Sequence, residues 1–162
     1  MVGDEPRDGA QTVQVEPVSF ADKQVLRHLV EFYVYDYSDY MGWDVDEHGV
    51  FGYRYLDHYW TEPDRHPFFI RVDGRLAGFA LVRSGAPHDM AEFFVMRKYR
   101  RGGVGTDAAR MVFERFPGTW EVRQMKENVA ATIFWRLAIP VRFDEEVRDG
   151  RPVQLFTIEG SS

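Results

Sequence analysis

The chain has 162 residues, a size that fits one domain, and no uninterrupted apolar run approaches the roughly 20 residues needed to cross a bilayer. It contains no cysteine, which excludes a disulfide framework, cysteine-ligated zinc and a thiol nucleophile. The formal net charge of −6 argues against general binding of nucleic acid, whose affinity rests on neutralising phosphates. The acidic start lacks the apolar stretch of a secretory signal, so we expect a cytoplasmic protein.

The first part of the chain predicts one strand and two helices. Alternating apolar residues indicate a strand over 12–18, and helical spacing of apolar residues predicts a helix over 20–35. The apolar positions of that helix are Val25, Leu26, Leu29, Val30 and Tyr33. Residues 36–49 show no clean period and are interpreted as a loop or broken helix, and a second helix is predicted over 50–60. Two prolines at 63 and 67 exclude its continuation.

The middle of the chain predicts a hairpin and then a strand. Strands over 68–72 and 75–83 flank Asp73-Gly74, and this dipeptide favours a type I′ turn, in which both central residues need a positive φ. A further strand is predicted over 91–96. Together with the preceding elements, these strands predict one domain over 12–159, after a disordered or loosely ordered stretch at 1–11.

The last part predicts two helices and three strands. One helix starts near Gly105 and ends before Pro117, and a strand follows over 119–123. That helix is expected to bury Ala108, Met111, Val112 and Phe116. Asn128 is a good N-cap for the next helix, whose predicted buried stripe is Ala130, Ile133, Phe134 and Leu137. Strands over 141–147 and 152–158 are joined across Asp149-Gly150.

The most informative segment is the basic, glycine-rich turn 97–106, which connects the strand over 91–96 to the following helix. The first N–H groups of a helix lack intrahelical partners, and glycines allow an anion to approach the backbone closely. Arg97, Lys98, Arg100 and Arg101 add positive charge to an otherwise acidic chain. The pattern favours a pyrophosphate site. The alternative is a solvated surface turn whose glycines only permit tight strand-to-helix packing.

Two motifs carry a resemblance to a known family. Arg100, Gly103 and Gly105 match the pattern (Arg/Gln)-x-x-Gly-x-(Gly/Ala), and Asn128, Ala131 and Phe134 match Asn-x-x-Ala-x-x-Phe on the next helix. Both patterns resemble those of the GNAT superfamily of acetyl-CoA-dependent N-acetyltransferases. The resemblance is strongest over 68–139 and extends to the element order of nearly the whole chain.

The resemblance implies an α/β (α+β) fold: a mixed, mostly antiparallel, seven-stranded sheet, splayed between strands 4 and 5, with about four helices. It implies acetyl-CoA as co-substrate, with pantetheine in the cleft and pyrophosphate on the amides of 101–106, and no metal. Arg97, Lys98 or Arg100 is implied as the partner of the 3′-phosphate. The implied cofactor-binding residues are Phe94, Val95, Met96, Arg100, Arg101, Gly102, Gly103, Val104, Gly105, Thr106, Asn128, Phe134 and Trp135.

Two residues are the candidate catalytic groups. By the resemblance, the N–H of Val95 polarises the thioester carbonyl. The amine acceptor must lose a proton, and Glu92 on the same strand is the best carboxylate to take it, directly or through water. The alternative for Glu92 is an edge residue paired with an arginine. Trp135 stands where many family members have a tyrosine that protonates the leaving thiolate, so another hydroxyl or water must supply that proton.

The acceptor is expected to bind opposite the CoA turn, near Tyr33, Asp36 and Tyr37. This segment is aromatic and acidic, which favours a small, cationic amine, although the aromatic residues could instead belong to the core. We therefore predict an N-acetyltransferase (EC 2.3.1 class) that acts by direct attack in a ternary complex, as a monomer or homodimer, with no nucleic-acid or membrane partner. The competing interpretation is an acyl-CoA-binding sensor or scaffold with little or no turnover.

Overall fold

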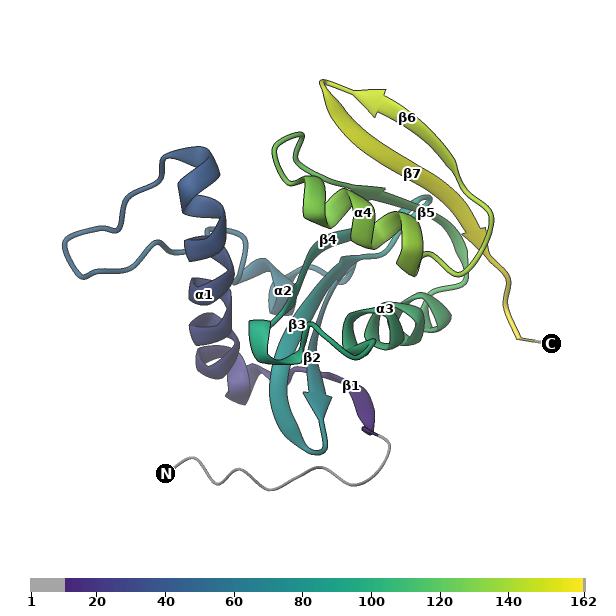
Figure 1. The fold of residues 1–162 in the computed structure, drawn as a ribbon. Coiled ribbons are helices and arrows are strands. Elements are labelled where there is room, and N and C mark those ends of the chain that lie inside the picture. Colours follow the sequence, from purple (N-terminus) through teal and green to yellow (C-terminus); the bar gives the residue numbers. More distant parts are fainter. Residues whose placement is uncertain (1–10, 162) are drawn as a thin grey trace.

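The computed structural model describes residues 11–161, so the predicted loose stretch at 1–11 lies outside the described residues except for Gln11. Seven strands and four α-helices follow one another along the described chain (Figure 1). They are β1 (Val13–Pro17), α1 (Lys23–Met41), α2 (His58–Thr61), β2 (Arg65–Val72), β3 (Arg75–Arg83), β4 (His88–Val95), α3 (Val104–Arg115), β5 (Gly118–Arg123), α4 (Val129–Ala138), β6 (Asp144–Arg148) and β7 (Arg151–Ile158). Two 3₁₀ turns lie at Phe20–Asp22 and Arg97–Tyr99.

All seven strands form one sheet in the order β1-β2-β3-β4-β5-β7-β6. Every neighbouring pair is antiparallel except β4 and β5, which run parallel. The predicted fold class is therefore confirmed: a mixed, mostly antiparallel seven-stranded sheet with four helices.

The sheet opens between its two parallel strands. β4 pairs with β5 only at His88–Trp120 and Asp89–Glu121, near the start of β4. Beyond these two pairs the strands diverge, so the carboxyl half of β4 has no strand on its β5 side (Figure 1). The splay predicted between strands 4 and 5 is confirmed, and it leaves backbone groups of β4 available to a ligand.

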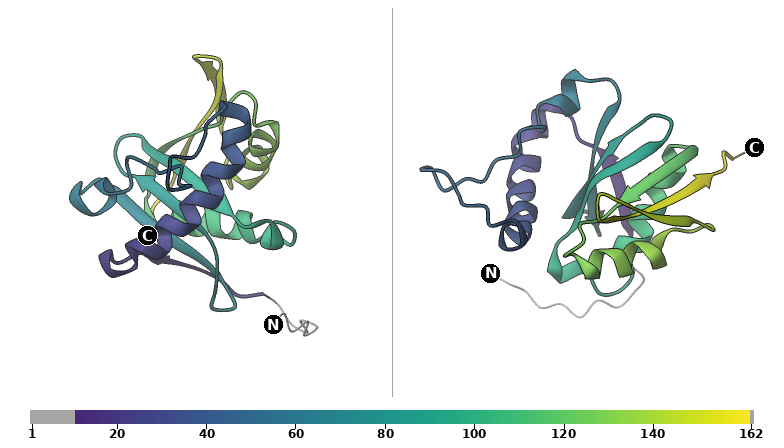
Figure 2. Two further views of the ribbon diagram at one scale, coloured as in Figure 1. Left: turned by 90° about the vertical axis from the view of Figure 1, so that its left-hand side faces the viewer. Right: turned by 90° about the horizontal axis from the view of Figure 1, so that it is seen from above.

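Each face of the sheet is covered by helices and has its own apolar cluster. On one face, Leu26, Leu29 and Val30 of α1 pack with Phe79 and Leu81. The other face packs against α3 and α4 through a cluster that includes Ala108, Val112, Phe113, Trp120, Trp135 and Phe156. Figure 2, seen from above, shows α1 and the later helices on opposite sides of the sheet.

Both predicted Asp-Gly turns have the expected backbone. Asp73 and Gly74 have φ values of 50° and 79°, and Asp149 and Gly150 have 51° and 78°. Positive φ at both central residues is the condition for a type I′ turn, whose twist matches that of the flanking strands. These turns set the β2–β3 and β6–β7 hairpins.

The predictions for the region between β1 and β2 need correction. The first helix starts later than expected and continues to Met41, six residues into the segment interpreted as a loop or broken helix. The predicted second helix over 50–60 is wrong, because only His58–Thr61 is helical. Gly52 has a φ of 75°, and the carboxylate of Glu31 accepts the N–H groups of Phe51 (3.1 Å) and Gly52 (3.0 Å). These contacts with α1 hold residues 51–52 in a non-helical conformation.

The buried face of α4 also differs from the prediction. Thr132, Trp135 and Ala138 are buried, whereas Ile133 and Leu137 are 53% and 80% exposed. The hydrophobic pattern of this helix points toward Phe134, but packing buries the side that contains the polar Thr132. The predicted stripe is correct only for the partly buried Phe134, which packs against the core.

Smaller differences concern element ends. β2 begins at Arg65 and β4 at His88, each three residues before the prediction, while β6 begins at Asp144, three residues after it. In α3, Ala108 and Val112 are buried as predicted, but Met111 is only partly buried and Phe116 lies just past the helix end. Both still pack against the core.

Candidate active site

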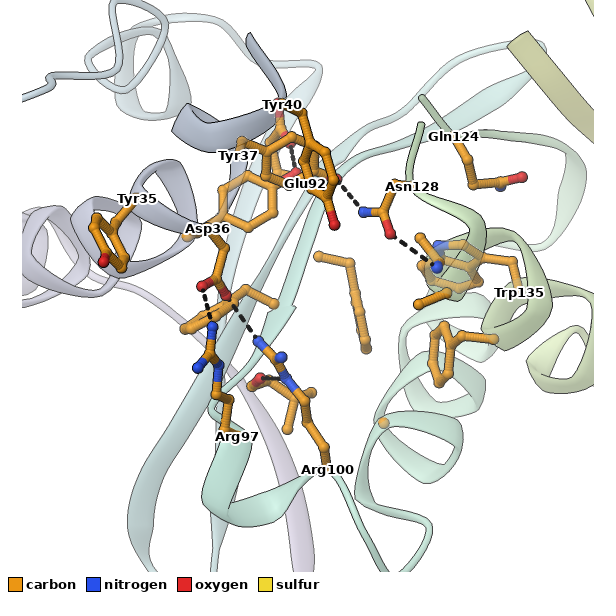
Figure 3. A pocket seen from close by; sticks show the side chains of 18 of the residues that line it. Tyr35, Asp36, Tyr37, Tyr40, Glu92, Arg97, Arg100, Gln124, Asn128 and Trp135 are labelled. Atoms are coloured by element: carbon orange, nitrogen blue, oxygen red, sulfur yellow. Dashed lines mark hydrogen bonds and ion pairs between the residues drawn. The ribbon is translucent and has the colours of Figure 1, made fainter. Parts of the chain in front are cut away.

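The open part of the sheet borders a cavity of about 1050 Å³. Its walls are the second half of α1, the strand β4, the start of α3 and the first turns of α4. Figure 3 shows α1 and α4 on opposite sides of this space, with side chains of both directed into it. The cavity thus lies where the divergence of β4 and β5 leaves backbone groups unpaired.

The turn before α3 has the backbone that an anion site requires. Gly102 and Gly103 have φ values of 113° and 81°, which side-chain-bearing residues rarely adopt. A Cβ added at Gly103 would have no atom within 4 Å, so this position faces open space. The N–H groups of the first turn of α3 have no intrahelical partner and lie at the positive end of the helix dipole.

Position 105 needs a glycine for a different reason. A Cβ at this position would lie 3.0 Å from Cε2 of Phe134, so the glycine permits α3 to pack closely against α4. The two glycines of the first motif therefore have separate functions: Gly103 provides backbone conformation and open space, and Gly105 provides helix packing. The packing at Gly105 is between two helices, whereas the alternative stated for the glycines concerned packing of a strand against a helix.

Two arginines of the turn make ion pairs with α1. Arg97 Nη2 lies 3.0 Å from Asp36 Oδ1, and Arg100 Nη2 lies 3.1 Å from Asp36 Oδ2 (Figure 3). Arg97 is 78% exposed at its side chain. The charge of Asp36 is thus balanced by the turn, and both arginines remain accessible to an anion that enters the cavity.

The edge of β4 that faces the gap offers the N–H of Val95. Met96 N–H donates to Ala77 O of β3 at 2.8 Å. Because successive N–H groups of an extended strand point to opposite edges, those of Val95 and Phe93 point away from β3, toward the gap. The carbonyl of Val95 accepts a hydrogen bond from Arg100 Nε at 2.7 Å, which fixes the end of the strand.

Glu92 projects into the cavity because β4 contains a β-bulge. Leu81 pairs with Glu92 and Val82 with Met90, so Ala91 is an extra residue. Simple alternation would place Met90 and Glu92 on the same face, but Met90 packs into the cluster on the α3 side. The bulge turns Glu92 to the α1 side, where its carboxylate lines the cavity.

Two phenols hold the Glu92 carboxylate. Tyr33 Oη donates a short hydrogen bond to Oε2, and Tyr53 Oη lies 3.4 Å from Oε1. Burial raises the pKa of Glu92 to about 7, although the hydrogen bonds from both tyrosines favour its charged form. The residue has no arginine partner among the described side chains, so the edge-residue alternative does not describe its surroundings.

Sequence reasoning missed Tyr53 and Phe93. Tyr53 follows the loop after α1, and no local pattern relates it to a carboxylate 39 residues away. Phe93 lines the cavity two residues before Val95 and shares its backbone direction, so strand alternation around Val95 would have identified it.

The start of α4 forms the wall opposite α1. Asn128 caps the helix as predicted, because its Oδ1 accepts the N–H of Ala131 at 3.1 Å. Its Nδ2 donates to Tyr37 Oη at 3.4 Å across the cavity. Trp135 is only 6% exposed, and its ring packs edge-on against Phe93 at 5.0 Å between centroids.

The cavity brings together most of the residues singled out from the sequence. From that set, its lining includes Tyr33, Asp36, Tyr37, Glu92, Phe94, Val95, Arg100, Gly103, Gly105, Thr106, Asn128, Phe134 and Trp135. Four others, Met96, Arg101, Gly102 and Val104, do not contribute to the lining, and Val104 is buried as the first residue of α3.

Two kinds of feature are absent from the part of the chain that the structure describes. Over residues 11–161, no helix has both the length and the apolar composition required to span a bilayer. Within the same residues, no three side chains of histidine, cysteine, aspartate or glutamate gather as metal ligands. The polar side chains that line the cavity are phenols, carboxylates, arginines, the carboxamides of Gln124 and Asn128, and the hydroxyls of Ser38 and Thr106.

The sheet opens between its two parallel strands over this cavity, and comparison with known proteins identifies the family. Residues 23–138 match the family model described as the acetyltransferase (GNAT) family. Because the match covers most of the chain, the protein belongs to the GNAT acetyltransferase family. A search of curated proteins finds no match.

Solved structures share the fold at low sequence identity. An acetyltransferase from Thermus thermophilus aligns with a TM-score of 0.70 and 16% identity, over 91% of this chain and 97% of that one. A GNAT-family acetyltransferase from Staphylococcus aureus gives 0.66 and 10%, over 91% and 100%. The PaiA N-acetyltransferase from Thermoplasma acidophilum, in complex with coenzyme A, gives 0.61 and 11%, over 90% and 99%. The sheet, its opening and the surrounding helices are thus those of a GNAT fold.

Proposed function

We propose that this protein transfers the acetyl group of acetyl-CoA to a primary amine of a small molecule by direct attack in a ternary complex. The observation that carries the proposal is the position of Glu92, a carboxylate that lies inside the cavity beside the open edge of β4. Family membership supports acetyl-CoA as the acyl donor, as does the coenzyme A bound to the Thermoplasma neighbour.

The chain has groups suited to bind the pyrophosphate, the further phosphate charge and the thioester of acetyl-CoA. The free amides at the start of α3, behind the positive-φ glycines 102 and 103, suit a pyrophosphate. The exposed guanidinium of Arg97 and the half-exposed one of Arg100 suit further phosphate charge. The N–H of Val95 points into the gap and is the group suited to polarise the thioester carbonyl.

Glu92 suits the role of the general base. A primary alkylamine has a pKa of about 10 and is mostly protonated near neutrality, so a proton must leave before or during attack. A base works best when its pKa is close to the working pH, and burial brings the pKa of Glu92 to about 7. Tyr33 and Tyr53 orient the carboxylate through their hydroxyl groups.

The acceptor side supports a cationic amine through two acids of the predicted aromatic, acidic segment other than Asp36. Asp36 is paired with two arginines, so its charge is already balanced. Asp39 and Asp44 also line the cavity, and neither forms an ion pair within the described residues. With Tyr35, Tyr40 and Trp43 they provide a negative, aromatic entrance that favours a cation.

The competing function is an acyl-CoA-binding sensor or scaffold with little turnover. The burial of Trp135 favours it, because the indole fills the core and provides no acid at that position. The presence of Glu92 in the cavity favours turnover instead, because a binding module gains nothing from burying a carboxylate whose desolvation is costly.

An acceptor panel tests the proposal. Purified protein is mixed with acetyl-CoA and with matched amines that differ in charge, and release of the CoA thiol is followed with a thiol reagent. We expect turnover with small primary amines, fastest for acceptors with a second positive charge. Tight CoA binding without thiol release for any amine would favour the sensor, and equal rates for neutral and cationic amines would contradict the proposed acceptor class.

A further inference from the structure

The burial of Trp135 raises the question of which group protonates the departing thiolate. The indole packs against Phe93 and against Phe113, at 6.1 Å between centroids for the latter, and is a hydrogen-bond donor without useful acidity. The assignment of another group to this role rests on the proposed acetyl transfer. A candidate must line the cavity, carry a transferable proton, and be held in place by neighbours.

Tyr37 meets these conditions from the opposite wall. It lies on α1, lines the cavity, and receives a hydrogen bond from Nδ2 of Asn128 at 3.4 Å (Figure 3). The Oδ1 of Asn128 accepts the N–H of Ala131, so the amide is fixed with its nitrogen toward Tyr37. An amide nitrogen only donates, and Tyr37 Oη therefore accepts from it and keeps its own proton for another acceptor.

Tyr37 is also connected to the base. Tyr33 lies one turn earlier on α1, and the two rings are 4.6 Å apart at their centroids. The hydroxyl of Tyr33 donates to Glu92, and burial, the charge of Glu92 and the phenol of Tyr37 raise the pKa of Tyr33. Tyr33 therefore stays protonated between them. The side chains of Glu92, Tyr33, Tyr37 and Asn128 form one series that runs from β4 past α1 to α4.

We propose that Tyr37 protonates the departing CoA thiolate and that Asn128 is the positioning residue for its phenol. The lone pair of the amine forms the C–N bond, the C–S bond breaks, and its electron pair stays on sulfur, which takes the proton of Tyr37. The amine proton goes to Glu92. The Tyr37 phenolate then regains a proton from Glu92 through Tyr33, so that no proton is gained or lost when the amine enters uncharged, and an amine that enters protonated first releases its extra proton to solvent.

The first test changes the phenol and the leaving group together. Tyr37→Phe keeps the ring and removes the proton, and kcat with acetyl-CoA is expected to fall about a hundredfold, as for other general acids. The selenoester analogue of acetyl-CoA has a more acidic leaving group that needs less protonation, so with it the variant should lose less than about tenfold. Tyr55→Phe removes a phenol outside the cavity and is the matched control.

The second test changes the positioning residue. Asn128→Ser keeps a good N-cap for α4 and removes the amide that reaches Tyr37. We expect a smaller loss of kcat than for Tyr37→Phe and unchanged helix content by circular dichroism. As for Tyr37→Phe, the loss should be smaller with the selenoester than with acetyl-CoA. Combined with Tyr37→Phe, it should add little to the loss of the single variant, because both act on one proton.

Three outcomes would overturn the inference. Tyr37→Phe could retain wild-type kcat, or it could lose activity equally with the thioester and the selenoester, which would make Tyr37 a purely structural residue. In both cases the wild-type protein still releases CoA, and the proposed function stands. Absence of thiol release by the wild-type protein with every amine would instead overturn both proposals.

Discussion

The two sides of the cavity are built in different ways. The proposed CoA wall, residues 93–106, is a strand edge and a glycine-containing turn whose candidate binding groups are mostly backbone amides. The proposed acceptor wall, residues 33–53, consists of α1 and the following loop; side chains from the stretch 33–44 line the cavity, and Tyr53 contacts Glu92. One salt-bridge cluster joins them, since Asp36 of the acceptor wall pairs with Arg97 and Arg100 of the CoA wall.

This difference explains why the first wall is easier to predict. Backbone amides are positioned by local conformation, which glycines 102 and 103 set within a few residues. The side chains of the acceptor wall obtain their function from distant partners, as Tyr33 does from Glu92, 59 residues away.

The largest effect is expected at the residue that faces both walls. Glu92→Gln removes the proposed base, and kcat should fall by about 10²–10⁴, the usual contribution of a general base. The affinity for CoA, measured by calorimetry, should remain unchanged because the carboxylate contacts no part of the glycine turn. Equal activity of the variant and the wild type would remove Glu92 from the mechanism.

Glu92 should also make stability depend on pH. Its pKa in the folded protein, about 7, is above the ordinary value of 4.5, so the folded state holds its proton more tightly than the unfolded state. This contribution is fully present below about pH 4.5 and is lost as the pH rises through 7. The free energy of unfolding, measured with urea, should rise for Glu92→Gln relative to wild type by up to about 3 kcal/mol between pH 4.5 and pH 8.5. A constant difference would contradict the raised pKa.

The CoA wall is tested through its backbone. Gly103→Val forces a branched side chain into a conformation with a φ of 81°, and it also fills the open space beside the amides. We expect an increase in KM for acetyl-CoA of about tenfold, in line with the roughly 1–2 kcal/mol cost of left-handed backbone. Gly150→Val has similar strain in the remote β6–β7 turn and should lose stability without this change in KM.

Tyr53 tests whether the acceptor wall tunes the base. Tyr53→Phe removes a hydrogen bond that favours the charged carboxylate, so the pKa of Glu92 should rise above about 7. In the pH profile of kcat/KM, the ascending limb should then move to higher pH, while the value at high pH changes less. Tyr55→Phe, which does not contact Glu92, serves as the control, and an unshifted profile in Tyr53→Phe would show that Tyr53 does not set this pKa.

The smallest effect is expected for the exposed acids of the acceptor wall. Asp39→Asn combined with Asp44→Asn should raise the KM for a dicationic amine. The increase should be only about two- to fivefold, because exposed charges interact weakly. The KM for an amine with an uncharged tail should not change. The effect should decrease with added salt. Glu114→Gln combined with Glu159→Gln changes the net charge equally but lies outside the cavity. An equal response in both pairs would mean that the acids act only through net charge.

Much of the fold was predictable because its signals are local. The Asp-Gly turns, the Asn128 cap and the glycine turn depend on φ preferences and on hydrogen bonds within a few residues. The helix predicted over 50–60 failed because Glu31, far away in sequence, takes the amides of residues 51 and 52. The buried face of α4 was misassigned because its hydrophobic pattern points toward Phe134, whereas packing buries the side that contains the polar Thr132.

The sequence by itself determined the succession of strands along the chain, the tight turns and the glycine-containing start of α3, because each of these follows from the conformational limits of a few adjacent residues. The tertiary structure alone decided that a bulge at Ala91 turns Glu92 toward α1, that two tyrosines hold its carboxylate, and that Trp135 is buried. These features depend on strand register and on packing between distant segments, and the free energies that fix them come from contacts that no local window contains.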